Sequence, residues 1–96
     1  MESRFRQKVS EFIGSYAEYF APPGDGWPDL CVCPLNENIP IFFIEFKRYK
    51  NKGHGIMDNQ EDIIDFLRSR GTRVLVLAGD EPWKDTLIDI FRGVDI

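Results

Sequence analysis

The feature that most constrains the fold is the run from Ile39 to Phe46, which is apolar at nearly every position. A strand covered on one face alternates apolar and polar residues, whereas a strand buried on both faces reads as a continuous apolar run. The run therefore predicts a central strand with cover on both sides of its sheet. Glu45 is the exception within it, because burying a carboxylate is costly unless it has partners.

The first third of the chain predicts a helix followed by a hairpin. Apolar residues recur at helical spacing from residue 3 to about 15, where Gly14 ends or weakens the pattern. Residues 16–21 are either the last helical turn or a short strand, and we predict the strand. Residues 30–32 form the next strand, which a turn at residues 34–38 joins to the apolar run. Strands joined by so short a turn pair antiparallel.

The second half predicts helix, strand, helix. Asp58 or Asn59 can cap a helix that stops at Gly71, residues 72–78 form another buried strand, and Pro82 lies in the first turn of a last helix. A strand, helix and strand in succession pair in parallel through a right-handed crossover. We therefore expect an α/β fold with a mixed sheet flanked by helices. The length of 96 residues predicts one domain, residues 1–96.

The hairpin brings charged residues together. Asp29 opens the first of its strands and Glu45 lies near the end of the second, so antiparallel pairing places them at the same end. Alternation puts Lys47 on the same face as Glu45. Two close carboxylates favour a raised pKa or a divalent cation between them, and a lysine beside a cation can orient water or offset phosphate charge. The arrangement is that of a metal-dependent nuclease.

Each of these residues also has a plainer interpretation. Glu45 and Lys47 can be a surface ion pair at a strand end. Gln60 can be a solvent-facing residue at a helix start, and for Gln60 we favour this interpretation on the residues alone. Trp27 can stack on a base or pack beside the site, and both stay open. We expect His54, between two glycines, to be a solvated loop residue rather than a base.

The charge balance has two sides. A net charge of −4 counts mildly against nucleic-acid binding, because phosphate contacts usually need a basic surface. However, local patches matter more than the total. A basic segment without an acid follows the apolar run, and its members are Lys47, Arg48, Lys50 and Lys52.

Cys31 and Cys33 share one face of a strand, which is poor geometry for a disulfide. With His54 remote from them, they are too few to bind zinc, so we expect two small apolar core residues with reduced thiols. Reduced thiols, together with the lack of a signal peptide or of an apolar run of about 20 residues, predict a cytoplasmic protein without a membrane partner.

Three segments together resemble one known family. The segments are Gly26-x-Pro28-Asp29, then Phe43-Ile44-Glu45-Phe46-Lys47-Arg48, then Gln60-x-x-x-Ile64-x-x-Leu67-x-x-x-Gly71-x-x-Val74. In this order they resemble the VRR-NUC family of the PD-(D/E)xK nuclease superfamily, from about residue 24 to 78. The resemblance implies a restriction-endonuclease-like αβββαβ core. Stand-alone domains of this size occur in phages, and fused ones in repair nucleases.

The resemblance also implies roles for single residues. The catalytic residues would be Asp29, Glu45, Lys47 and Gln60. Mg2+ or Mn2+ would be held by Asp29, Glu45 and the Phe46 carbonyl. An acidic residue on the first helix would complete the metal site, and we prefer Glu2 to Glu11.

The resulting expectation is a metal-dependent DNA endonuclease that acts on branched or structured DNA. Arg48, Lys50 and Lys52 would hold flanking phosphates, which carry no sequence information. Stand-alone members tend to dimerise, and one site cannot cut a junction symmetrically, so we expect a homodimer in a phage-infected or bacterial cytoplasm. The alternatives are an inactive nucleic-acid-binding module with a nuclease fold and a small adaptor in which Glu45 and Lys47 merely pair.

Overall fold

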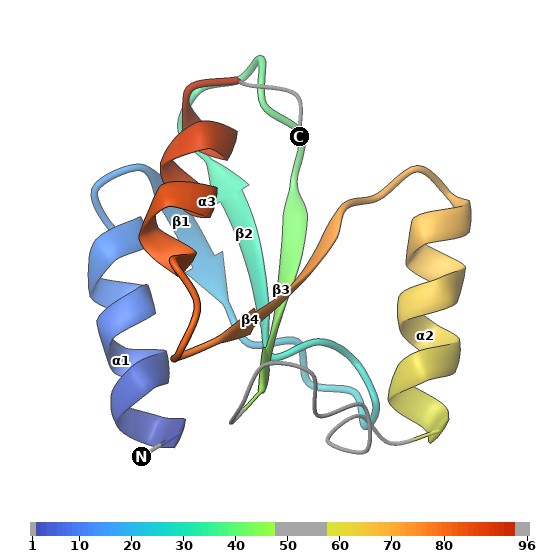
Figure 1. Ribbon diagram of the computed structural model, residues 1–96. Helices are drawn as coiled ribbons and strands as arrows, with labels where there is room; N and C mark the ends of the chain where they lie inside the picture. The colour runs from blue at the N-terminus through green and yellow to red at the C-terminus, as the bar shows by residue number, and fades with distance from the viewer. Residues whose placement is uncertain (1, 48–57, 94–96) are drawn as a thin grey trace.

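The computed structural model describes residues 2–47 and 58–93, with the side chains of residues 4–47 and 60–93. The elements are α1 (Glu2–Ile13), β1 (Ala17–Phe20), β2 (Leu30–Pro34), β3 (Phe42–Lys47), α2 (Asp58–Ser69), β4 (Val74–Ala78) and α3 (Trp83–Phe91) (Figure 1). This order confirms the predicted α/β class, and residues 17–20 are the strand that we preferred to a helical turn.

The four strands of the described chain form one mixed sheet in the order β1-β2-β3-β4. The β1–β2 and β2–β3 pairs are antiparallel, and β3 pairs with β4 in parallel. The predicted hairpin is therefore β2–β3, and the predicted crossover runs from β3 through α2 to β4. Because β3 has a strand on each side, the prediction that the apolar run is central is confirmed.

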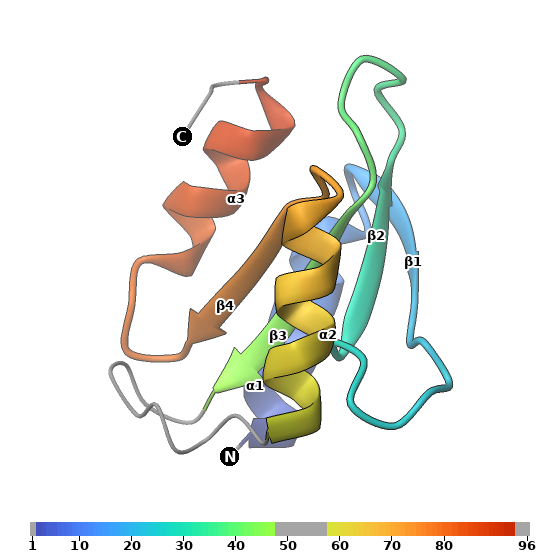
Figure 2. The same cartoon turned by 90° about the vertical axis from the view of Figure 1, so that its right-hand side faces the viewer.

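Helices cover the two faces of the sheet unequally. Helices α1 and α3 lie on one face and α2 on the other (Figure 1). The face under α1 and α3 holds the larger core, to which β3 contributes Phe42, Ile44 and Phe46. The face under α2 holds a smaller cluster of Ile64, Leu67 and Val74, with Phe43 against it. Figure 2 shows that α2 lies over β3 beside β4, while β1 and β2 extend beyond it on this face.

The central strand is shorter than the apolar run that predicts it. Strand β3 begins at Phe42, three residues after Ile39. Pro40 has no N–H to give to a strand ladder, which explains the late start. Ile41 is exposed, whereas Ile39 still reaches the core from outside the strand. The prediction of burial on both faces is therefore wrong for Ile41 and correct from Phe42 onward.

The helix ends follow the glycines. Helix α1 stops at Ile13, before Gly14, and α2 stops shortly before Gly71, whose φ is 83°. The Gly71 N–H donates to the Arg68 carbonyl and the Thr72 N–H to the Leu67 carbonyl, so both of these carbonyls near the end of α2 are satisfied. Only glycine adopts this left-handed conformation without steric cost. The predicted cap at Asp58 or Asn59 lies outside the described side chains.

Both cysteines are free thiols. Cys31 is buried and Cys33 half-buried, in agreement with their prediction as core residues. Burial raises the pKa of the Cys31 thiol from 9.0 to about 11, and the neighbouring Cys33 adds to this rise. Within the described part of the chain, no helix has the length and apolar character that crossing a bilayer requires.

Candidate active site

The predicted site residues that the structure describes lie at one end of the sheet. The first turns of α1 and α2 and the last residues of β3 lie at the same end of the molecule in both views (Figures 1 and 2). Parallel pairing places the end of β4 beside the end of β3, with Lys47 opposite Ala78. Segments that are far apart in the sequence therefore contribute side chains to one region.

Asp29 stands one residue before β2, at the point where the strand ladder ends. Leu30 pairs with Ile44, so the next position along the hairpin sets Asp29 opposite Glu45, as predicted. The Asp29 Oδ2 accepts a hydrogen bond of 2.8 Å from the Phe46 N–H. The carboxylate thus accepts a hydrogen bond from a main-chain N–H of β3 that lies beyond the last paired residue of β2. Pro28 before it is fully buried, which anchors the approach to Asp29.

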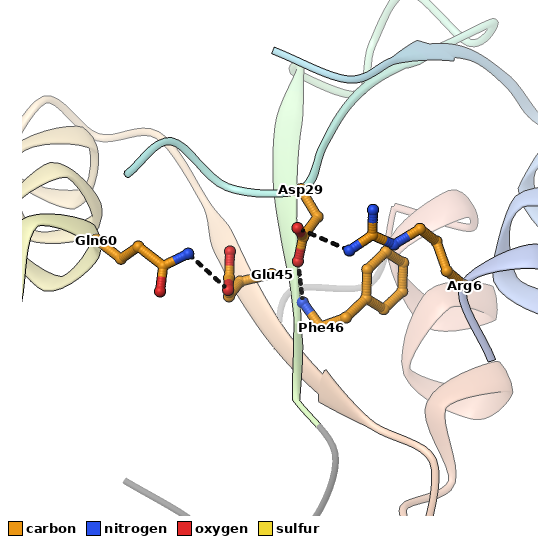
Figure 3. Close-up of polar contacts among 5 residues, drawn as sticks. All are labelled: Arg6, Asp29, Glu45, Phe46 and Gln60. Atoms are coloured by element: carbon orange, nitrogen blue, oxygen red, sulfur yellow. Dashed lines mark hydrogen bonds and ion pairs between the residues drawn. The ribbon is translucent and has the colours of Figure 1, made fainter. Parts of the chain in front are cut away.

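A second partner of Asp29 comes from α1. The Arg6 Nη2 donates to Asp29 Oδ1 over 2.9 Å, forming an ion pair (Figure 3). The same guanidinium lies over the ring of Phe46, 5.4 Å from its centroid. Both oxygens of Asp29 therefore accept from a fixed donor. Arg6 was not among the predicted residues. A basic residue on a helix gives no sequence signal that it will contact a carboxylate 23 residues further along the chain.

Glu45 faces the other helix. Its side chain is on the α2 side of β3 and the residue is only 4% exposed. The Gln60 Nε2 donates to Glu45 Oε2 over 3.2 Å (Figure 3). The solvent-facing interpretation of Gln60 is therefore wrong, because the crossover returns the first turn of α2 over the end of β3. Gln60 supplies a donor to a carboxylate that would otherwise be expensive to bury.

Lys47 lies at the end of β3 and is half-buried. Alternation along β3 places it on the same face as Glu45. Within residues 4–47 and 60–93 no ion pair joins Lys47 to Glu45. Glu45 is also buried rather than at the surface, so the structure does not contain the surface pair of the plainer interpretation. On the same face, Trp27 packs against Phe43 at 6.0 Å between ring centroids and stays partly exposed.

The two acidic candidates on α1 lie at opposite ends of that helix. Residue 2 opens α1 at the site end, about one turn before Arg6. Glu11 is about 13 Å further along the axis. It accepts a hydrogen bond from Gln7 and lines a groove with Phe12 and Trp83. The main chain of residue 2 is therefore the closer of the two to the site.

Several predicted residues lie outside the described part of the chain. They are the phosphate-binding candidates Arg48, Lys50 and Lys52, the loop residue His54 and the side chain of Glu2.

The atoms at the site that could bind a metal ion are all oxygens, which suits a hard divalent cation such as Mg2+ or Mn2+. They are the carboxylates of Asp29 and Glu45 and the carbonyl of Phe46, which points to the same side of β3 as the Phe46 N–H. Among the residues that the structure describes, no three acidic, histidine or cysteine side chains surround one point. One or two carboxylates are nevertheless sufficient for Mg2+, which keeps several of its waters.

Comparison with known proteins identifies the family. The sequence model of the VRR-NUC domain matches residues 2–81, which is most of the chain and includes every described site residue. No curated protein and no solved structure matches the chain. The mixed sheet with flanking helices is consistent with a restriction-endonuclease-like core. The chain therefore belongs to the VRR-NUC family of nuclease domains.

Proposed function

We propose that this protein is a Mg2+- or Mn2+-dependent deoxyribonuclease that cuts phosphodiester bonds within branched or structured DNA. Membership of a nuclease family supports hydrolysis, and a nuclease domain implies DNA as the partner. The observation that carries the proposal is that Asp29 and the Glu45–Gln60 pair lie at the same end of β3, which Lys47 closes. Burying a carboxylate at the end of a core strand costs stability, so its presence there favours a role in function.

The chain provides both the ligands and their orientation. Asp29, Glu45 and the Phe46 carbonyl would hold the cation, with Glu2 completing the set. A bound divalent cation would acidify a water molecule and offset negative charge on the scissile phosphate. The Phe46 N–H orients Asp29 over 2.8 Å, and Gln60 orients Glu45 over 3.2 Å. These bonds reduce the entropy that ligand side chains would lose on binding.

Lys47 would act on the water or on the phosphate. Its ammonium is on the Glu45 face at the last residue of β3, so it can hold a water by hydrogen bonding or stabilise charge that develops on phosphate oxygens. Arg48, Lys50 and Lys52 follow directly in sequence and would hold neighbouring phosphates. Such contacts position a backbone without reading bases, so discrimination would rest on DNA shape.

The test is cleavage of labelled four-way junctions, flaps and plain duplexes in Mg2+, Mn2+ or EDTA. We expect cleavage with either ion, none in EDTA, and a preference for the branched substrates. Lys47→Ala and Asp29→Asn should each lower the rate by roughly a hundredfold or more. Activity that survives both substitutions would contradict the proposed site, and equal cleavage of all three substrates would contradict the preference for branches.

The proposal includes a homodimer in a phage-infected or bacterial cytoplasm, since a symmetrical cut across a junction requires two sites. Gel filtration with light scattering at micromolar concentration should give twice the chain mass. A strict monomer would remove the dimer.

A second candidate is a DNA-binding module that keeps the fold without catalysis. The net charge of −4 counts against DNA binding in both candidates, with or without cleavage, and so leaves this module as an alternative to the nuclease. It predicts that junctions bind but stay intact in both metal ions. Lys47→Ala would then have no rate to change.

A further inference from the structure

The ion pair between Arg6 and Asp29 gives the proposed metal site a positive charge of its own. We propose that Arg6 acts as a built-in counter-charge, which stabilises Asp29 when no divalent cation is bound and lowers the affinity of the site for that cation. The inference rests on the proposed function, in which Asp29 is a metal ligand. Arg6 is here a positioning residue, because it contacts Asp29 rather than substrate.

The contact has the geometry of a fixed interaction. Arg6 Nη2 and Asp29 Oδ1 are 2.9 Å apart, a distance typical of charge-assisted hydrogen bonds. The side chains of Arg6 and Asp29 are 41% and 21% exposed, so solvent reaches the pair only in part. The ring of Phe46 supports the guanidinium at 5.4 Å, and Phe46 also donates its N–H to the other oxygen of Asp29. Arg6 is thus held between a carboxylate and an aromatic face.

The charges explain why such a contact belongs at this place. Hairpin register brings Asp29 and Glu45 to the same end of the sheet, where two carboxylates raise each other's energy. When no divalent cation is bound, the guanidinium of Arg6 offsets the negative charge of Asp29 through their ion pair. A Mg2+ or Mn2+ ion at Asp29 would perform the same task and would be repelled by the guanidinium. Arg6 and the divalent cation therefore compete in charge.

Binding of a divalent cation does not require Arg6 to move away from Asp29. Each carboxylate oxygen has two lone pairs, so Asp29 can keep its bond to Phe46 while it accepts a further ligand. This bond and the buried Pro28 keep Asp29 in place when Arg6 is changed. Loss of the Arg6 charge should therefore act mainly through electrostatics rather than through disorder of the carboxylate.

The experiment compares Arg6→Gln with a matched control on the same helix. Glutamine keeps a side-chain donor but removes the charge, whereas Arg4→Gln removes the same charge from an exposed position that does not contact Asp29. For both variants and the wild type, calorimetry gives the Mn2+ dissociation constant and thermal melting gives Tm in EDTA and in Mn2+. We expect Arg6→Gln to melt lower in EDTA, to gain more from Mn2+ and to bind it roughly three- to tenfold more tightly. Arg4→Gln should stay within about twofold of wild type.

Arg6→Lys separates charge from geometry. It retains the charge, so its Mn2+ affinity should stay near the wild-type value; an affinity like that of Arg6→Gln would overturn the proposal. If Arg6→Gln is unfolded in EDTA, Mn2+ should restore its fold, and failure to do so would also overturn it. If the wild type binds Mn2+ and Arg6→Gln binds it equally or more weakly, the role proposed for Arg6 is refuted, while the metal site stands. Wild type without any response to Mn2+ refutes the metal site itself.

Discussion

The two faces of β3 differ sharply in what they contain. Toward α1 and α3 the strand presents Phe42, Ile44 and Phe46 to a cluster of twelve buried residues in the described part of the chain. Toward α2 the same strand presents Phe43, Glu45 and Lys47, and the buried cluster there has three described members. One face therefore supplies most of the apolar burial that stabilises the fold, which lets the other face bury a carboxylate and place a lysine beside it. Substitutions on the two faces should accordingly change the free energy of unfolding by different amounts and in opposite directions.

The largest effect is expected from the α1 side of β3. Phe42 is 1% exposed in the main core, so Phe42→Ala should lower the free energy of unfolding by about 3–5 kcal/mol, measured by urea denaturation. Phe66 is 57% exposed, and Phe66→Ala should change it by about 0.5 kcal/mol or less. Similar losses in the two variants would show that the core is not concentrated where we place it.

A smaller loss is expected from the Gln60–Glu45 pair. Gln60→Ala removes a donor from a buried carboxylate and should cost about 1–3 kcal/mol of stability in EDTA. Gln7→Ala is the matched control, because Gln7 donates to Glu11 over 3.3 Å at an exposed position. That variant should be nearly neutral by the same denaturation measurement. A neutral Gln60→Ala would mean that water replaces the amide at Glu45.

Neutralising the buried carboxylate should have the opposite sign. Glu45→Gln keeps the shape and a hydrogen-bonding group while it removes a charge that is expensive to bury, so we expect a gain of about 1 kcal/mol in EDTA. The same variant should be unable to cleave DNA. Exposed Glu18 on β1 gives the control, since Glu18→Gln should leave stability unchanged. A clear loss of stability in Glu45→Gln would show that the charge itself supports the fold.

The smallest effect concerns the thiols of β2. Because burial raises the pKa of Cys31 to about 11, its thiol stays protonated at neutral pH and should react with iodoacetamide more slowly than Cys33. Mass spectrometry after brief alkylation, with Cys33→Ser as the control, measures this order. The protonated thiol is favoured in the folded state, so its stabilisation is complete below pH 9 and should be lost as pH rises through about 11. Faster reaction at Cys31 would contradict its burial.

The fold was largely predictable because its signals are local. The two-sided apolar run predicted the central strand, and the loop lengths on either side predicted one antiparallel and one parallel neighbour. Gly71 predicted the end of α2 for a steric reason. The start of β3 was predicted too early, since the apolar run begins before Pro40, which has no N–H to donate to a strand ladder.

The site was predictable only in part. Hairpin register follows from the residue pattern, so Asp29 could be set opposite Glu45 from the sequence alone. The partner of Glu45 depends on where α2 returns to the sheet, and the residues alone therefore favoured the wrong, solvent-facing interpretation of Gln60. Arg6 was missed for the same reason, since it approaches Asp29 from a helix on the opposite face.

The amino-acid pattern alone was enough for the α/β class, the central strand, the pairing of the hairpin and the family resemblance, because apolar periodicity and turn chemistry act over a few neighbouring residues. Packing of α1 and α2 on opposite faces of the sheet decided which groups surround each carboxylate: Arg6 and the Phe46 N–H at Asp29, and Gln60 at Glu45. These contacts join residues far apart in the chain. They depend on the position of whole helices, which no short stretch of sequence encodes.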